Sequence, residues 1–210
     1  MSVTTVSDPT AIDWPARQAR AAIPFEVING RPVNPCQRTG IRGRNKMRQW
    51  GENLAADAMV TITDDSGMRW LLMVERSDGN GWALPGGHVD PGENPAPDAA
   101  VRELAEETSV ILPGAIWRTA APRYVPDPRA SDEAWMVTVL SRTDLAIPYR
   151  AQFPEPVAAD DAVRAAWIWA DRYADVVAHL AEEYGGVVFP AHVDMLRDAL
   201  DANLPEHAAS

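Results

Sequence analysis

The chain has 210 residues, a length that corresponds to one domain with extensions or to two small domains. Its hydrophobic fraction of 46% and its charged fraction of 23% are ordinary for a globular protein and argue against general disorder. The net charge of −11 argues against a non-specific binder of nucleic acid or of anionic membranes, because both need a basic surface. A phosphate ligand is compatible with this charge if a divalent cation binds with it.

The sequence predicts neither a membrane anchor nor an export signal. Its longest apolar runs, such as residues 134–140, are far shorter than the roughly 20 residues that a membrane span needs. No basic stretch precedes an apolar core at the N-terminus. The single cysteine, Cys36, allows no disulfide within the chain and no cysteine-based zinc site. We therefore expect a cytoplasmic protein.

The first quarter of the chain is expected to be rich in loops. Residues 1–24 are polar and without sustained periodicity, apart from a short helix after Asp13, and predict a partly ordered arm. Residues 25–33 predict a β-hairpin, because Asn29-Gly30 favours a tight primed turn. Residues 34–53 predict a basic loop, which is either solvated or a clamp for an anionic ligand. Its cations are Arg38, Arg42, Arg44, Lys46 and Arg48.

Short strands and a few helices are predicted for the remainder. The expected strands are residues 58–63, 69–75, 82–84, 116–119, 134–140 and 164–169. The expected helices are residues 94–109, 171–184 and 191–200. Asn94 suits the N-cap of the first helix and Pro95 its first position, where a missing N–H has no cost. Strands flanked by a few helices indicate a mixed α/β sandwich.

The segment richest in residues that could bind a metal ion or act in catalysis is 86–110, which reads GGHVDPGENPAPDAAVRELAEETSV. Helical positions three and four apart share a face, so Glu103, Glu106 and Glu107 project close together. Like charges in this arrangement repel by roughly a few tenths of a kcal/mol. A hard cation such as Mg²⁺, which binds carboxylate oxygens, relieves that repulsion. The alternative is an acidic helix face exposed to solvent.

The residues before these glutamates favour the metal interpretation. Pro85-Gly86-Gly87 predicts a sharp turn whose backbone carbonyls could reach a metal ion. Glu93 precedes the helix and Arg102 adjoins Glu103, so an arginine–glutamate pair would fix the loop against the acidic face.

These residues resemble the signature of the Nudix hydrolases. Gly87 and Glu93 keep the first spacing of that signature, and residues 102–107, RELAEE, match its centre. The chain departs from the pattern twice, since eight residues rather than seven separate Glu93 from Arg102, and Ser109 stands where the pattern has glycine. The extra residue lies near residues 95–97, where it can be absorbed without moving the glutamates relative to one another.

Segments outside the signature are similar to mitochondrial-type ADP-ribose pyrophosphatases and to the ADP-ribose-binding domain of melastatin-type cation channels. Before the signature these are residues 29–35, 38–44 and 50–57, and after it residues 124–135. The resemblance implies a Nudix-type α/β/α sandwich with a mixed sheet. It implies a single domain over residues 25–204, between an N-terminal arm of residues 1–24 and a C-terminal tail of residues 205–210.

The resemblance also implies an activity, the Mg²⁺-dependent hydrolysis of the pyrophosphate bond of ADP-ribose to AMP and ribose 5-phosphate. The metal ligands would be the side chains of Glu103, Glu106 and Glu107 with a backbone carbonyl of Gly86 or Gly87, and Mn²⁺ is an alternative to Mg²⁺. Arg102 and Glu93 complete the implied catalytic set. The general base stays open.

Four residues after the signature are implied substrate contacts. Asp127 and Arg129 have the spacing of a pair in the channel's ADP-ribose cleft, where arginine forks to phosphate and aspartate accepts a ribose hydroxyl. The alternative is a turn capped by Asp-Pro. Phe189 and His192 resemble an aromatic-x-x-His element near the distal ribose. We add Arg38 from the basic loop as a substrate contact, and we expect His88 to line the pocket.

Two other functions stay open, a non-catalytic ADP-ribose sensor and a Nudix hydrolase of another nucleoside diphosphate derivative. The intact set from Arg102 to Glu107 favours hydrolysis over sensing. In each case the partner is a small nucleoside diphosphate, and neither nucleic acid nor a membrane is expected. The oligomeric state is not predicted.

Overall fold

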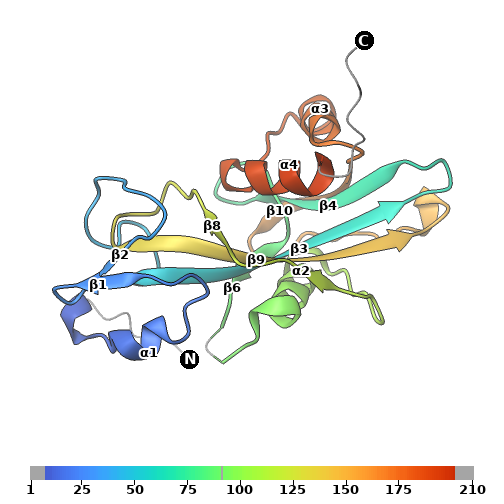
Figure 1. Ribbon diagram of the computed structural model, residues 1–210. Coiled ribbons are helices and arrows are strands. Elements are labelled where there is room, and N and C mark those ends of the chain that lie inside the picture. Colours follow the sequence, from blue (N-terminus) through green and yellow to red (C-terminus); the bar gives the residue numbers. More distant parts are fainter. Residues whose placement is uncertain (1–7, 91, 202–210) are drawn as a thin grey trace, which may run out of the picture.

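The computed structural model describes residues 8–90 and 92–201 (Figure 1). Eight strands form its central sheet: β3 (Gly51–Thr63), β4 (Arg69–Arg76), β5 (Trp82–Ala83), β6 (Gly86–His88), β7 (Arg118–Thr119), β8 (Arg123–Val125), β9 (Ala134–Ala146) and β10 (Ala162–Trp169). The strand order along the main path is β10-β4-β3-β9-β7, while β5 pairs with β4, β6 with β3 and β8 with β9. The sheet is mixed, because β3 and β9 are parallel and the other pairs are antiparallel.

Helices cover both faces of this sheet, which gives the predicted α/β/α sandwich. Helix α2 (Ala100–Thr108) lies on one face, and α3 (Tyr173–Tyr184) and α4 (Val193–Asp201) lie on the other (Figure 1). Successive side chains of a strand point to opposite faces. Leu71 and Met73 of β4 accordingly pack in the core with α3 and α4, whereas Trp70 and Leu72 pack in the core with α2. Among the described helices, none combines the length and apolar character needed to cross a membrane.

The two central strands, β3 and β9, are longer than predicted. Strand β3 begins at Gly51 rather than at residue 58, and β9 continues to Ala146 rather than ending at residue 140. The prediction followed apolar runs, but the pairing continues through polar positions such as Asn53, whose buried amide donates to Gln49 O at 3.0 Å. The longer β3 places Asp57 inside the sheet.

Most other elements agree with the predictions to within a few residues. The predicted strand 116–119 is reduced to the two residues of β7, and β8 was not predicted. Helix α3 ends at Gly185, which has a φ of 60°, as the glycine pair predicts. The predicted helix 191–200 consists of a 3₁₀ turn, η4 (Pro190–His192), followed by α4. A further 3₁₀ turn, η3 (Arg150–Gln152), follows β9.

The start of the predicted helix 94–109 is different from the expectation. The regular helix α2 begins at Ala100 and is preceded by a π-helical turn, η2 (Pro95–Ala99), that is interrupted by a non-helical Ala96. Ala99 N donates to Asn94 O at 3.2 Å, a bond that spans one residue more than an α-helical bond. This turn absorbs the extra residue before Arg102.

The end of α2 shows how serine replaces the glycine of the pattern. Ser109 caps the helix in the left-handed region, with a φ of 57°, and its N–H donates to Ala105 O at 2.9 Å. A residue other than glycine in this region costs roughly 1–2 kcal/mol. The helix therefore closes with the same geometry that glycine would give, at some cost in stability.

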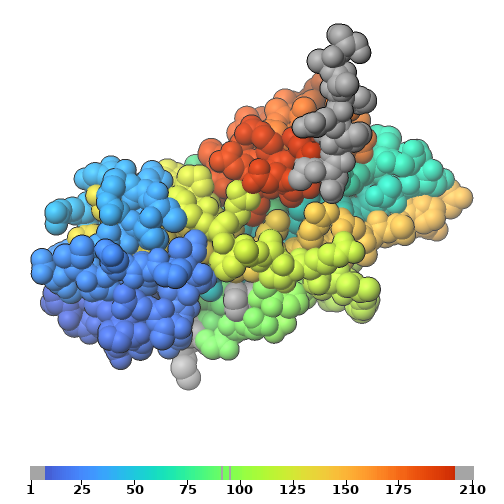
Figure 2. Space-filling view, viewed as in Figure 1, coloured from blue at the N-terminus to red at the C-terminus, as the bar shows by residue number. Residues whose placement is uncertain are grey.

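The described part of the predicted N-terminal arm, residues 8–24, packs onto the domain. This segment forms a 3₁₀ turn, η1 (Pro9–Ala11), and the short helix α1 (Trp14–Gln18) that was expected after Asp13. The Trp14 ring is buried and lies edge-on to Phe25, which in turn contacts Trp135 of β9 with ring centroids 5.1 Å apart. Figure 2 shows these residues, in blue, packed as one body with the loop that follows them.

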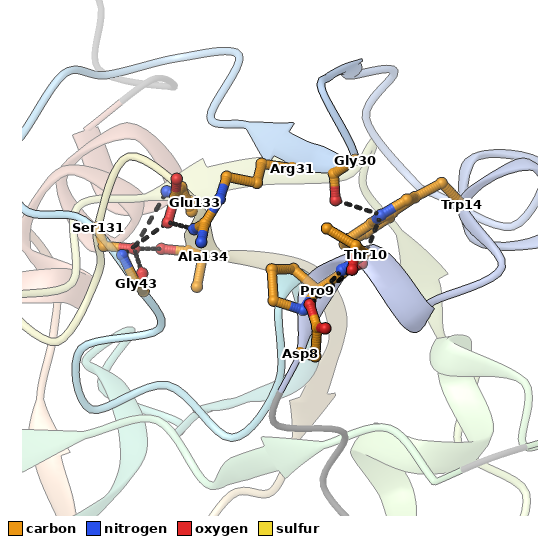
Figure 3. A network of polar contacts seen from close by, with 10 residues as sticks. All are labelled: Asp8, Pro9, Thr10, Trp14, Gly30, Arg31, Gly43, Ser131, Glu133 and Ala134. Carbon is orange, nitrogen blue, oxygen red and sulfur yellow. Dashed lines mark hydrogen bonds and ion pairs between the residues drawn. The ribbon is translucent and has the colours of Figure 1, made fainter.

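The predicted hairpin joins the same packing. Strands β1 (Glu26–Ile28) and β2 (Arg31–Val33) meet at Asn29 and Gly30, which have φ values of 53° and 75°, as a primed turn requires. Trp14 Nε1 donates to Gly30 O at 2.9 Å, and Arg31 pairs with Glu133 at 2.9 Å (Figure 3). The hairpin is thereby fixed to the segment before β9. The predicted tail, residues 205–210, lies outside the described residues.

Candidate active site

A cavity of about 500 Å³ lies where β3, β4, β6 and β9 meet the segments around Asp127 and His192. Its wall contains all four predicted substrate contacts after the signature, together with Glu107 and the predicted pocket residue His88. Arg38 does not line this cavity, because its guanidinium donates to Asn34 O within its own loop. A different arginine of the basic loop, Arg48, lines the cavity instead.

The guanidinium of Arg102 binds three carboxylates beside the cavity. Its Nε and Nη2 donate to the two oxygens of Glu93 at 2.9 and 3.0 Å. Its Nη1 donates to Glu103 and to Glu106, both at 2.8 Å. These contacts raise the pKa of Arg102, the Glu93 hydrogen bond most of all. The Glu93–Arg102 pair forms despite the extra residue, because the π-helical turn takes up the added length.

The predicted metal ligands do not all occupy the same position. Glu107 and Gly87 line the cavity, and Glu107 is buried, with its carboxylate accepting from Gly86 N at 2.9 Å. Burial is the main reason that the pKa of Glu107 rises to about 8, and the charges of Glu103 and Asp57 raise it further. Burial also raises the pKa of Glu103. Glu106 is half exposed and points toward Arg102.

Gly86 and Gly87 form strand β6 rather than the sharp turn that the sequence predicted. Each of the two positions requires glycine, because a carboxylate occupies the space that a Cβ atom would need. A Cβ atom on Gly87 would lie 2.5–2.7 Å from the Glu103 carboxylate, and one on Gly86 would overlap the carboxylate of Asp57. The absence of two side chains thus lets the acidic groups of β3 and α2 approach the same strand.

The register of β6 also distinguishes the two glycine carbonyls. Ala58 N donates to Pro85 O and Val89 N donates to Leu54 O, on either side of the pair that Gly87 forms with β3. This alternation places the backbone groups of Gly87 in the ladder and turns those of Gly86 toward α2. The metal-ligand role of Gly87 stays a prediction, and the carbonyl of Gly86 is the better placed of the two.

Gly87→Ala is expected to lower the free energy of unfolding by about 1–3 kcal/mol, because the new methyl group overlaps the Glu103 carboxylate in a packed site. Urea denaturation would measure this change. The double variant Gly87→Ala/Glu103→Asp, whose shorter side chain withdraws from the methyl group, should recover part of the loss. Wild-type stability of Gly87→Ala would contradict the proposed close packing.

Asp57 is a cavity residue that the sequence reasoning missed. Its buried carboxylate accepts from Thr138 Oγ1 at 2.5 Å, and its Oδ1 lies 3.7 Å from His192 Nε2. His192 Nδ1 accepts from Leu84 N at 3.1 Å, so the ring proton resides on Nε2, toward Asp57. Burial lowers the pKa of His192, which favours this neutral ring. A charged residue inside an apolar strand was the signal that could have identified Asp57.

Asp127 and Arg129, the implied substrate contacts, form an ion pair with each other. Arg129 Nε donates to Asp127 Oδ1 at 2.9 Å and Arg129 Nη2 donates to Oδ2 at 2.6 Å, while the aspartate side chain is buried. The guanidinium fork of Arg129 is therefore already occupied by a carboxylate. On the neighbouring wall, the Arg76 guanidinium lies 4.5 Å from the Phe189 ring centroid and pairs with Asp78 at 2.6 Å.

The residues around Gly86 fit a hard cation by their chemistry, although the described side chains do not form a finished site. No three histidine, cysteine or carboxylate side chains in the described part of the chain converge closely enough to hold a metal ion as they stand. Asp57, Glu103 and Glu107 lie near one another, and of these only Glu103 has an arginine partner within the described residues. Clustered carboxylate oxygens with unbalanced charge suit Mg²⁺ or Mn²⁺.

Comparison with known proteins identifies the family. The family model of the NUDIX domain matches residues 53–183 of the sequence. This range includes β6, α2 and the whole network of Arg102. The chain belongs to the Nudix family. The match begins within β3 and ends in α3, so the Nudix core contains Asp57, Asp127 and Arg129, whereas Arg48, Phe189 and His192 lie outside the matched range.

Relatives of this Nudix chain include an enzyme and a channel. The mitochondrial ADP-ribose pyrophosphatase of Rattus norvegicus is 33% identical over 180 residues, which cover 69% of this chain and 49% of that protein. A transient receptor potential cation channel protein of Nematostella vectensis, subfamily M member-like 2, is 33% identical over 143 residues, covering 55% of this chain and 9% of the channel. The Nudix chain thus spans about half of the first relative and a small part of the second.

Solved structures support the fold. The MutT/nudix family protein from Enterococcus faecalis superimposes with a TM-score of 0.56 at 22% identity, covering 75% of this chain and 64% of that chain. At this identity the likeness shows the shared Nudix fold. The fold prediction of a single Nudix-type sandwich is confirmed.

Proposed function

We propose that this Nudix hydrolase cleaves the pyrophosphate bond of ADP-ribose and releases AMP and ribose 5-phosphate. The observation that carries the proposal is the network of Arg102, which holds Glu93, Glu103 and Glu106 beside a cavity lined by buried Glu107. The similarity to the rat mitochondrial ADP-ribose pyrophosphatase supports the choice of substrate.

The proposed roles follow from what each residue contacts. Arg102 is a positioning residue, because it fixes the loop before α2 against the helix through Glu93 and orients Glu103 and Glu106. Gly86 N donates to one oxygen of the Glu107 carboxylate, and within the described residues no hydrogen bond engages the other oxygen, which is proposed to bind the metal ion. Asp127 and Phe189 line the same cavity and are proposed to hold the sugars of the substrate.

We propose Mg²⁺, with Mn²⁺ as the alternative, as the cofactor. Glu103, Glu106 and Glu107 would hold it with the carbonyl of Gly86 or Gly87, once the contacts of Arg102 to the first two glutamates are shared with the cation. A bound divalent cation would neutralise the pyrophosphate and activate a water molecule. The overall charge favours this cofactor, because the chain has a net charge of −11 and the substrate is itself an anion.

A second candidate function is the binding of ADP-ribose without hydrolysis. Two observations favour it, the similarity to a channel protein and the engagement of Glu103 and Glu106 by Arg102. A third candidate is the hydrolysis of another nucleoside diphosphate derivative, since the signature leaves the substrate open. We further propose that the catalytic domain comprises residues 25–204 and that the protein is cytoplasmic, with residues 1–24 as its N-terminal segment.

One incubation separates these candidates. With ADP-ribose and Mg²⁺, we expect chromatography to detect AMP and ribose 5-phosphate, and we expect EDTA to abolish both products, because the carboxylates alone would repel the pyrophosphate. Tight binding of ADP-ribose without AMP, in Mg²⁺ and in Mn²⁺, would favour the sensor. Neither binding nor AMP would favour a different nucleotide substrate, which a nucleotide panel coupled to phosphate release would identify.

A further inference from the structure

Three arginines line the cavity, and two of them are already neutralised. Arg76 pairs with Asp78 at 2.6 Å, and Arg129 pairs with Asp127 at 2.6 Å. Arg48 is different, because none of the described residues forms an ion pair or a hydrogen bond with its guanidinium. It is therefore the cation of the cavity wall whose charge is available to a ligand.

The backbone around Arg48 is held in place. The adjacent Met47 is buried in a core with Phe189, Ala130 and other residues of the cavity's surroundings. Arg44 Nη1 donates to the carbonyl of Arg48 itself at 2.7 Å. A loop fixed in this way loses little conformational entropy when the exposed Arg48 side chain binds an anion.

A second unused polar group lies next to Arg48. His88 lines the same cavity, and its buried Nε2 has no hydrogen-bond partner among residues 8–90 and 92–201. The guanidinium groups of Arg48 and Arg129 lie near enough to this ring for their charges to act on it. Because a buried polar atom without a partner is costly, a ligand that supplies the missing bond gains affinity there.

We propose that Arg48 and His88 form a phosphate-binding subsite of the cavity. Arg48 is the main phosphate contact, and His88 Nε2 makes a second hydrogen bond to the phosphate. The inference rests on the proposed function for its ligand class, a nucleoside diphosphate, and deepens it by naming the residues that recognise the phosphates. Arg129 then serves mainly to hold Asp127. The lining of the cavity then includes this cationic contact as well as the side chains of Asp57 and Glu107.

Equilibrium binding of ADP and adenosine tests this subsite, because the two probes differ only in their phosphates. Calorimetry in Mg²⁺, with chromatography to verify that ADP stays intact, should show that Arg48→Ala weakens ADP binding about tenfold to a hundredfold, the range of a hydrogen bond to a charged group. Adenosine affinity should be unchanged. Arg48→Lys should retain part of the ADP affinity, and His88→Met should weaken ADP binding several-fold.

Arg42→Ala is the matched control, because it removes the same charge from the same loop at an exposed residue that does not line the cavity. Its ADP affinity should equal that of the wild type. The subsite would be overturned by an Arg48→Ala protein that binds ADP within twofold of the wild type, by an equal loss for adenosine, or by an equal loss in Arg42→Ala. A wild type that binds ADP no better than adenosine would overturn it as well. A failure to hydrolyse ADP-ribose would refute the proposed function alone, since this comparison involves no turnover.

Discussion

Glu107→Gln is expected to reduce the turnover of ADP-ribose at least about a hundredfold, which corresponds to roughly 2.7 kcal/mol of transition-state stabilisation. The amide keeps the size of the buried side chain but removes a negative charge from the proposed metal site. Glu106→Gln should also lower turnover about a hundredfold if the cation takes this glutamate from Arg102. Steady-state kinetics at saturating Mg²⁺ would measure both effects. Near-normal turnover of both variants would eliminate the metal assignment.

The stability of Glu107→Gln provides an independent check with a defined pH dependence. The pKa of Glu107 is raised from 4.5 to about 8 in the folded protein, so folding retains a proton that the unfolded chain releases. The resulting stability is fully present below pH 4.5 and is lost as the pH rises to about 8. In EDTA, the variant should match the wild type near pH 5 and melt at a higher temperature near pH 8. Glu182→Gln, at an exposed position of α3, should show neither effect.

Arg102→Ala is expected to affect both stability and activity. The variant leaves Glu93, Glu103 and Glu106 without their shared cation, and Glu103 is buried. Because Arg102 is itself partly exposed, we expect a loss of about 2–3 kcal/mol in the free energy of unfolding rather than the larger cost of a fully buried pair. Turnover should fall about 10–100-fold, the usual effect of losing a residue that orients metal ligands.

Arg102→Lys is the informative companion variant. An ammonium group cannot reproduce the fork that contacts both oxygens of Glu93 and the two glutamates of α2 at once, so only part of the loss should be recovered. Arg118→Ala removes an arginine that pairs with Asp144 at an exposed site, and it should change stability by less than about 0.5 kcal/mol. Equal stability of the wild type and Arg102→Ala would show that the network does not stabilise the fold.

The sandwich and its main elements were predictable because their signals are local. Alternating or continuous apolar residues identified the buried strands, and Asn29-Gly30 and Gly185 identified turns through their backbone preferences. The ends of β3 and β9 were not predictable in this way. Polar residues interrupt the apolar runs there, and the ends join the sheet because two strands distant in the sequence pair along their full length.

The residues of the candidate site likewise fall into those that local sequence predicts and those that depend on the tertiary arrangement. Arg102 and its glutamates follow from helical spacing, which is fixed by local geometry. Arg48 and Asp57 depend on which loop and which strand face the cavity, and the sequence does not contain that arrangement in any single segment. The choice of Arg38 illustrates the difficulty, since five cations within eleven residues are equivalent until the loop has a conformation.

Trp14 contacts Phe25, and Phe25 contacts Trp135. These contacts affect how the N-terminal segment unfolds locally. Trp135 is fully buried in β9, the strand that pairs with β3 at the centre of the sheet. Detachment of the segment from Trp14 to Phe25 would uncover this ring, because the three rings belong to one buried cluster. We therefore expect this segment and the central strand to unfold as one cooperative unit. In native-state hydrogen exchange, the amides of α1 would then be protected by the free energy of the core rather than fraying as chain ends usually do.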